Sequence, residues 1–421
     1  MELLNIIALL ITLAACFNYL NYRFIGLPTT IGIMAIALVV SLAVLVSGLF
    51  GFGLVVSAQS FVGAIDFNAA LMQGMLSFLL FASALHVNLN DLIKQMGPIL
   101  LLASVGIIFS TFVVGIAAWY IFAWLGIELP FIYCLLFGSL ISPTDPIAVM
   151  NILKTAGAPK TLETKIVGES LFNDGVAVVV FIVLLGILSG GGEISGSEIA
   201  FLFFEEAVGG IIFGLGLGFI GYRLLGTIDN YQLEIMITLA IVMGGYALAS
   251  ALHLSGPLAM VMAGLLIGNH GRLFAMSETT RQHVDETWHL IDEILNAVLF
   301  LLIGIELLAI TLNWSYLFAG LIMIVITLIT RFVSVSSLVT LMRRKREFSP
   351  GVIKILTWGG LRGGISVALA LSLPAGPERA EILTITYIIV VFSILVQGLT
   401  VGRLIKSTQS EQEPALEVGI D

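Results

Sequence analysis

Long apolar stretches recur along almost the whole of this 421-residue chain, and they constrain its fold more than any other feature. Hydrophobic residues make up 59% of the sequence and charged residues 11%, against roughly 25% charged residues in soluble domains. A helix needs about 20 apolar residues to cross a bilayer. Lipid offers no partners for unpaired backbone groups, and these stretches are too long for barrel strands. The sequence therefore predicts an all-α integral membrane protein.

Glycine, proline and charged residues divide the chain into apolar segments that we interpret as about 13 transmembrane helices. Residues 48–67 are rich in glycine and are either a re-entrant or an interfacial piece. Numbered along the chain, the predicted helices cover approximately residues 3–20, 27–47, 68–87, 97–124, 130–154, 162–189, 198–226, 232–252, 256–270, 287–311, 314–343, 350–373 and 381–405.

The positions of lysine and arginine test this division independently. Loops after odd-numbered helices, with the adjoining helix ends and the C-terminal tail, hold 15 of the 18 basic residues, whereas loops after even-numbered helices hold only Arg379. Because cytoplasmic loops carry the excess of basic residues, we expect the N-terminus outside and the C-terminus in the cytoplasm. The remaining two, Arg331 and Arg362, fall inside predicted helices.

An odd helix count permits two inverted six-helix repeats joined by a linking helix, an organisation found in many transporters. Under that pairing the fifth helix corresponds to the twelfth, and both contain helix-breaking residues: SPTDP at 142–146 and WGGLRGGIS at 358–366. The two prolines of SPTDP lack N–H groups, so the fifth helix should break around Thr144 and Asp145. Such a break can line a cavity. A simple proline kink with Asp145 as a local cap is the alternative.

The sixth helix contains the run GESLFNDG, followed by a long apolar stretch. Ionisable groups at membrane depth are costly and usually functional, so Asn173 and Asp174 are the first candidates. Ser170, Asn173 and Asp174 are spaced three and four residues apart and share one helix face, where their oxygens suit a hard cation. Glu169 points elsewhere and needs a buried cationic partner. A polar patch that only holds helices together is the alternative.

Arg331 and Arg362 are the two buried cations available to pair with Glu169, and we favour Arg331, with Arg362 second. Arg362 lies in GGLRGG, whose four glycines permit an unwound stretch. An arginine there can neutralise the negative ends of half-helices. Close packing through the GxxxG-like spacing of these glycines is the competing interpretation.

Four motifs in this order and spacing, SPTDPIAV, GESLFNDGVAVVVF, FLLIGIEL and GGLRGG, resemble the sodium/proton antiporters of the cation/proton antiporter-1 family, of the NhaP and NHE type. The resemblance covers essentially the whole chain. It implies a homodimer with a dimerisation domain and a mobile core of helices 4–6 and 11–13. The two broken helices would cross in that core, which moves like an elevator.

By this resemblance Asp174 matches the aspartate that binds the ion and carries the proton, with Asn173 beside it. Asp145, Thr144 and Ser170 match further ion ligands, so that Na+ would lie at Asp174, Asp145, Ser170 and Thr144. Glu169 with Arg331 matches a structural ion pair, and Arg362 the arginine of the broken twelfth helix. The pair Asn-Asp resembles the electroneutral branch. One departure is Ala82 in LLFASAL, where many relatives have an acidic residue; Ser83 or His86 is a weak substitute.

The resemblance also implies domain boundaries. We expect dimerisation helices in 1–96, core helices in 97–190, the linking and further dimerisation helices in 191–312, core helices in 313–406, and a short, acidic, disordered tail in 407–421.

The expected function is exchange of Na+ or Li+ for H+ across the cell (inner) membrane. Burial disfavours the charged form of Asp174 and a bound cation favours it, so proton and ion compete for one carboxylate. We expect no enzymatic activity, no cofactor and no nucleic-acid partner; the partners are Na+, H+, the lipid bilayer and a second copy of the chain. A K+/H+ antiporter of the same fold is the nearest alternative, and an ion channel a distant one.

Overall fold

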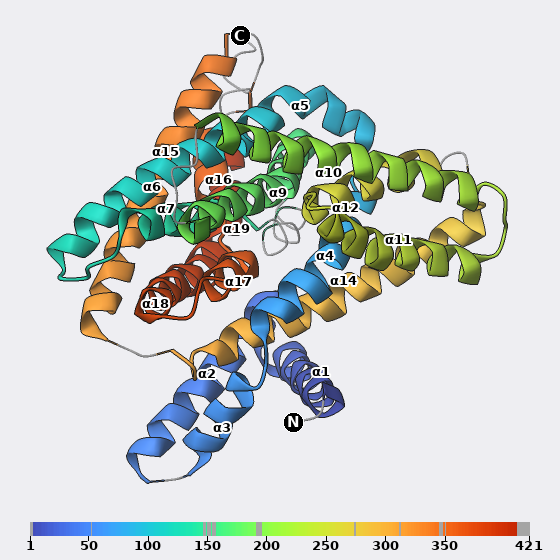
Figure 1. Cartoon of the computed structure of the whole chain (residues 1–421). Coiled ribbons are helices and arrows are strands. Elements are labelled where there is room, and N and C mark those ends of the chain that lie inside the picture. The colour runs from blue at the N-terminus through green and yellow to red at the C-terminus, as the bar shows by residue number, and fades with distance from the viewer. Residues whose placement is uncertain are drawn as a thin grey trace, which may run out of the picture.

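The computed structural model describes residues 3–51, 53–145, 149, 153, 157–190, 196–272, 275–310, 313–344, 348–349 and 351–410. Every regular element in these ranges is a helix, as the sequence predicts (Figure 1). Nine of the described helices are long and apolar enough to cross a membrane. The apolar helices Leu54–Gly63, Ala69–Leu85 and Phe131–Ile141 are shorter.

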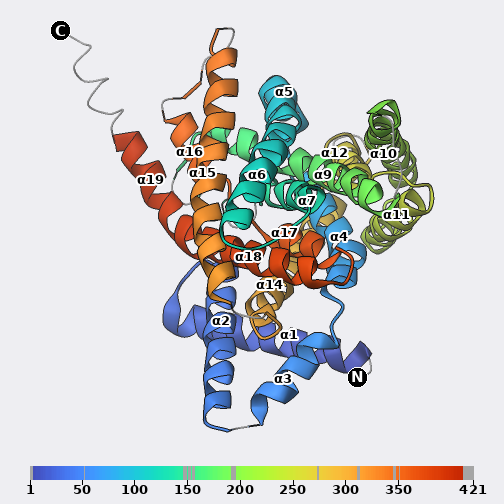
Figure 2. The same ribbon diagram turned by 60° about the vertical axis from the view of Figure 1, so that its left-hand side comes forward.

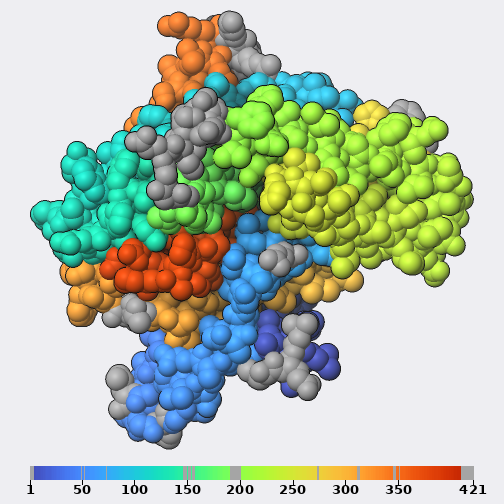
Figure 3. Space-filling view, in the orientation of Figure 1, coloured from blue at the N-terminus to red at the C-terminus, as the bar shows by residue number. Residues whose placement is uncertain are grey.

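The N-terminal region contains a short additional helix in the stretch whose structure the sequence left open. This helix, α3 (Leu54–Gly63), follows α2 and projects with it beyond the rest of the molecule (Figures 1 and 3). The next helix combines a π-helical turn with a regular part. The elements of this region are α1 (Leu3–Leu20), η1 (Asn21–Ile25), α2 (Thr29–Leu49), α3, η2 (Ala69–Met75) and α4 (Leu76–Leu85).

The predicted fourth helix begins earlier than expected. It starts with α5 (Leu89–Ala103), because the side chain of Asn88 accepts a hydrogen bond from the Asp91 N–H and caps the helix. Ser104 separates α5 from α6 (Val105–Trp124). The boundary that we expected between residues 96 and 97 therefore falls inside α5, since the polar residues before it form the first helical turns instead of a loop.

The next helices include the two that carry most of the predicted site. The fifth helix is represented by α7 (Phe131–Ile141), and its second half lies largely outside the described residues. The sixth is α9 (Lys160–Gly190). The elements that follow α9 in the chain are α10 (Gly196–Leu225), α11 (Tyr231–Ala251), α12 (Gly256–Leu266), η3 (Ile267–Gly271) and the long α14 (Glu278–Glu306).

The C-terminal helices include the second predicted break, between α16 and α17. The final helix extends four residues into the expected tail, and residues 411–421 lie outside the described part. The elements are α15 (Trp314–Met342), α16 (Val352–Trp358), α17 (Gly364–Leu371), α18 (Pro377–Phe392), η4 (Ser393–Gln397) and α19 (Gly398–Ser410).

Helices distant in the sequence pack into two groups with α9 between them (Figures 1 and 2). In the first group, α6 packs on α7 and α15, and α18 packs on α15 and α17. In the second group, α12 packs on α4, α10 and α11, and α14 packs on α2 and α4. Helix α9 contacts α5 and α7 of the first group as well as α10 and α12 of the second. Its middle turns therefore lie deep inside the molecule.

Candidate functional site

The two predicted helix breaks meet in the interior. Helix α7 ends at Ile141, and residues 142–145 are not helical; α16 ends at Trp358, and α17 resumes at Gly364. The backbone N–H of Asp145 donates a hydrogen bond of 2.7 Å to the carbonyl oxygen of Leu361. A Cβ atom on Gly363 would overlap the Asp145 side chain, so glycine is required where the two chains pass each other.

Arg362 joins the two breaks through backbone carbonyl oxygens that have lost their helical partners. Its Nε donates to the Ile141 oxygen at 3.0 Å, and its Nη1 donates to the Gly360 oxygen. Its own N–H donates to Ser393 Oγ at 2.8 Å. Ile141 and Gly360 lie at the C-terminal ends of α7 and α16, where the helix dipole is negative. A buried guanidinium there compensates the charge of both ends.

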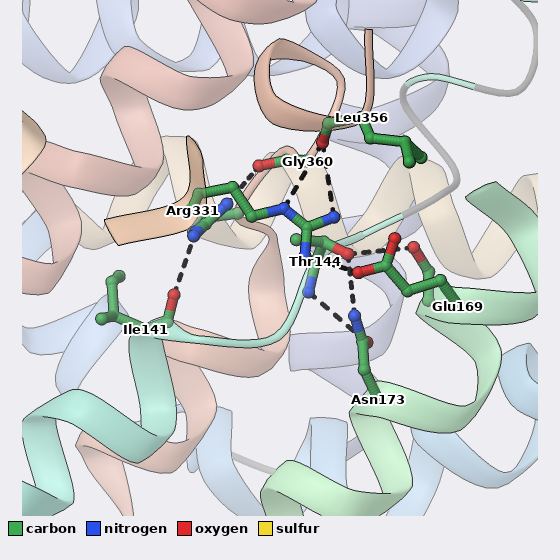
Figure 4. Close-up of polar contacts among 9 residues, drawn as sticks. Ile141, Thr144, Glu169, Asn173, Arg331, Leu356 and Gly360 are labelled. Atoms are coloured by element: carbon green, nitrogen blue, oxygen red, sulfur yellow. Dashed lines mark hydrogen bonds and ion pairs between the residues drawn. The ribbon is translucent and has the colours of Figure 1, made fainter. Parts of the chain in front are cut away.

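Glu169 of α9 forms an ion pair with Arg331 of α15. Oε1 of Glu169 lies 2.5 Å from Nη1 of Arg331, and the two side chains are 2% and 6% exposed. Arg331 also donates to the Leu356 carbonyl oxygen from Nε at 3.4 Å and from Nη2 at 3.3 Å. Of the two arginines that the sequence offered, the structure pairs Arg331 with Glu169. The pair thereby ties α9, α15 and the last turn of α16 together (Figure 4).

Thr144, Ser170 and Asn173 form a buried hydrogen-bond network between the fifth-helix break and α9. Nδ2 of Asn173 donates to Thr144 Oγ1 at 2.8 Å, and Thr144 Oγ1 lies 3.1 Å from Ser170 Oγ. The Thr144 N–H also points to Asn173 Oδ1 at 3.5 Å. Figure 4 shows the contacts between Thr144 and Asn173. Asn173 thus holds the unwound backbone against α9.

Asp145 and Asp174 line a pocket between the two groups of helices. The pocket offers about 40 Å³ to water-sized molecules, more than the roughly 10–15 Å³ that one water needs. Asp174 is 5% exposed and has no ion-pair partner among the described residues. The pocket is lined by Leu71, Leu76, Leu79, Leu80, Ser83, Pro143, Asp145, Leu171, Asp174, Leu299, Gly363, Gly364, Ile365 and Ser366.

This arrangement places two carboxylates in a mostly apolar pocket at membrane depth. Two like charges there are unfavourable unless a proton or a cation neutralises them. Carboxylate and hydroxyl oxygens suit hard cations, and the crossed breaks add backbone carbonyl oxygens nearby. Thr144 and Ser170 are not among the residues that line the pocket; their hydroxyls bond to each other behind it.

Two serines also line the pocket; the sequence did not single out Ser366, and it offered Ser83 only as a weak substitute for an acidic residue. Ser366 of α17 is 1% exposed and lines the pocket beside Asp174. Its position directly after the GGLRGG run was the available signal. Ser83 of α4 also lines the pocket, whereas the neighbouring Ala82 is buried and is not among the lining residues. His86 is exposed, and its Nδ1 lies 2.8 Å from the Ala82 carbonyl oxygen.

Comparison with known families identifies the fold and the family. The family described as "Sodium/hydrogen exchanger, transmembrane" matches residues 7–407. The chain belongs to the sodium/hydrogen exchanger family. Among relatives of this exchanger, a protein named Na(+)/H(+) antiporter NhaP from Pseudomonas aeruginosa is 53% identical over 417 residues, which covers 97% of this chain and 98% of that protein. NhaH from Halobacillus dabanensis is 35% identical over 86% of this chain and 89% of its own length.

A solved structure of similar fold belongs to the sodium proton antiporter MjNhaP1 from Methanocaldococcus jannaschii at pH 8. It matches the exchanger with a TM-score of 0.73 over 97% of this chain and 99% of that chain. The sequences are 19% identical, so this match concerns the fold. The membrane antiporter fold expected from the four motifs is confirmed.

Proposed function

We propose that this exchanger is a secondary active transporter that exchanges Na+ or Li+ for H+ across the cell (inner) membrane. The observation that carries the proposal is the pair Asp145 and Asp174 in a pocket where two broken helices cross. The curated relatives described above are named Na(+)/H(+) antiporters and align over nearly the whole chain, which supports the same pair of ions here.

Asp174 is the group for which proton and ion compete. When the carboxylate is charged it attracts Na+ to the pocket, with Asp145 on the other side and Ser366 as a neutral oxygen ligand. When it is protonated the charge is lost and the ion leaves. If the protein changes sides readily only with a proton or an ion bound, strict exchange follows. Raising the pH should therefore lower the apparent KM for Na+.

One exchangeable charge at Asp174, next to a neutral Asn173, favours electroneutral 1:1 exchange. Glu169 and Arg331 neutralise each other in a buried pair, so neither has reason to change charge during the cycle. We assign Thr144, Ser170 and Asn173 to holding the unwound backbone on α9, and Thr144 and Ser170 become ligands if their mutual contact opens toward the ion.

We further propose elevator-type alternating access in a homodimer with the N-terminus outside and the C-terminus in the cytoplasm. The packing of the described helices into two groups that meet at the pocket supports this motion. If the first group, together with α9, slides against the second group, the pocket opens to one side of the membrane at a time. The basic loops after odd-numbered helices support the orientation.

The test is an exchange assay in proteoliposomes that compares Na+, Li+ and K+ with and without a potassium ionophore. We expect Na+ and Li+ to drive H+ movement, and the rate to be unaffected when the ionophore clamps the voltage. A rate that responds to voltage would contradict the 1:1 stoichiometry. If only K+ drives H+ movement, the substrate is K+ and not Na+. An ion current without counter-transport would identify a channel.

A further inference from the structure

Helix α14 carries two polar residues, Asp292 and Asn296, in the turns before the pocket residue Leu299. Leu299 of α14 lines the pocket together with Asp145 and Asp174. Asn296 and Asp292 precede Leu299 by three and seven residues, a spacing that places all three on one face of the helix. At about 1.5 Å per residue, Asp292 lies about 10 Å along the axis from Leu299. The stripe runs from the pocket toward the N-terminal end of α14.

Both polar residues of this stripe carry buried oxygen atoms without a hydrogen-bond partner. Asn296 is 3% exposed, and its Oδ1 lacks a partner, as does Oδ1 of Asp292. Asn296 and Asp292 lie four residues apart, so their side chains are neighbours on the surface of the helix. Buried polar atoms are normally paired, because an unpaired one costs free energy. Both oxygens are therefore free to accept a ligand.

The stripe also continues beyond Asp292 to an exposed residue. His289 precedes Asp292 by three residues and so extends the same face of α14. His289 is exposed, lies 4.0 Å from Glu293, and its ring centroid is 6.5 Å from that of His86 on α4. Asp292 is thus the carboxylate of this stripe that lies between the exposed His289 and the pocket residue Leu299.

We propose that Asp292 and Asn296 form a transient binding site for Na+ on its approach to Asp145 and Asp174. The ion comes from the side of the membrane where α14 begins, which is the cytoplasm in the topology proposed above. Carboxylate and amide oxygens are ligands that hard cations accept. A single carboxylate attracts the ion and still releases it, as conduction through successive sites requires. The inference rests on the proposed function and adds an approach path to the same site.

The test compares Asp292→Asn with the parent and with Glu293→Gln in vesicles of known orientation. The rate of Na+-driven H+ flux at subsaturating Na+, supplied from the side where α14 begins, should fall about three- to tenfold in Asp292→Asn, because the local attraction for the cation is lost. Detailed balance requires Na+ release to that side to slow equally. The equilibrium Kd for Na+ should stay within about twofold, because Asp292 acts on the path and not on the final site. Glu293→Gln removes an exposed charge and should retain the parent rate.

A second variant, Asn296→Ala, removes an oxygen ligand without changing the charge, and we expect a fall of about two- to threefold. It also serves if Asp292→Asn does not fold. Parent-like rates in both variants would overturn the inference, as would a loss of rate that is matched by a weaker equilibrium Kd or a lower Tm. If the parent itself shows no exchange, the proposed function fails. If the parent exchanges Na+ for H+ and both variants do so at the same rate, only this inference fails.

Discussion

Two carboxylates on α9 lie five residues apart and differ in what surrounds them. Glu169 is buried against Arg331, which neutralises it at 2.5 Å. Asp174 is equally buried but lines a pocket with a second carboxylate, Asp145. Both carboxylates are therefore shielded from water, and the partner decides the role. The paired charge of Glu169 therefore stabilises the helix packing, whereas the charge of Asp174 is available to an ion.

The largest effect is expected from removing the unpaired charge. Asp174→Asn should reduce exchange by about a hundredfold or more, because the group that binds the ion and carries the proton is lost. Its Tm should match that of the parent, since no ion pair is broken. Proteoliposome flux and thermal unfolding measure the two quantities. Retained Na+-dependent H+ movement would contradict the assignment of Asp174.

Removing the paired charge should act on stability instead. Glu169→Ala leaves Arg331 buried without its partner, and we expect the free energy of unfolding to fall by about 3–5 kcal/mol. Thermal unfolding in lipid or detergent measures this loss. The matched control is the double variant Glu169→Gln with Arg331→Met, which leaves no uncompensated charge and should recover part of the stability. An inactive Glu169→Ala variant with the parent's Tm would show that the pair is not structural.

An intermediate effect is expected at the crossing of the two breaks. Arg362→Lys replaces the planar guanidinium, which reaches the carbonyl oxygens of Ile141 and Gly360 together, by a single ammonium group. One buried carbonyl then lacks its partner, and the free energy of unfolding should fall by about 1–3 kcal/mol. Thermal unfolding of this variant and of Glu169→Ala under the same conditions shows which of the two loses more stability. A stability equal to that of the parent would leave only the glycine packing as the reason for this motif.

The smallest effect is expected from a neutral oxygen in the pocket. Ser366→Ala should raise the apparent KM for Na+ about two- to fourfold, because one hydroxyl ligand is lost while both carboxylates remain. Flux at varied Na+ concentration measures the change. Ser83→Ala, on α4, is the control that tells whether the ion lies nearer α17 or α4. If neither variant changes the KM, the ion is held by the carboxylates and backbone alone.

Much of the fold follows from local sequence patterns. The helical class follows from long apolar stretches, and the breaks at 142–146 and 358–366 follow from proline and glycine chemistry. The start of α5 was missed because Asn88 and Asp91 look like loop residues until their capping contact is seen. The glycine-rich stretch 48–67 gave no periodic signal that would have predicted α3.

The candidate site was only partly predictable, because its residues come from helices far apart in the sequence. Spacing alone placed Ser170, Asn173 and Asp174 on one face of a helix. It could not show that Asn173 bonds to Thr144 and that Asp174 lines the pocket. Ser366 follows GGLRGG and Ser83 follows Ala82, but serine is small and common, and these positions alone do not show that either residue lines the pocket.

By itself the sequence determined that the chain is a helical membrane protein with costly charges at a few positions, because lipid penalises unpaired backbone and unpaired charge wherever they occur along the chain. Only the tertiary structure decided which charges meet. Arg331, and not Arg362, reaches Glu169, while Arg362 reaches the ends of two broken helices. Electrostatic attraction falls off with distance through space, and distance along the chain says little about it. The pairing that separates Glu169 from Asp174 therefore depends on the folded packing.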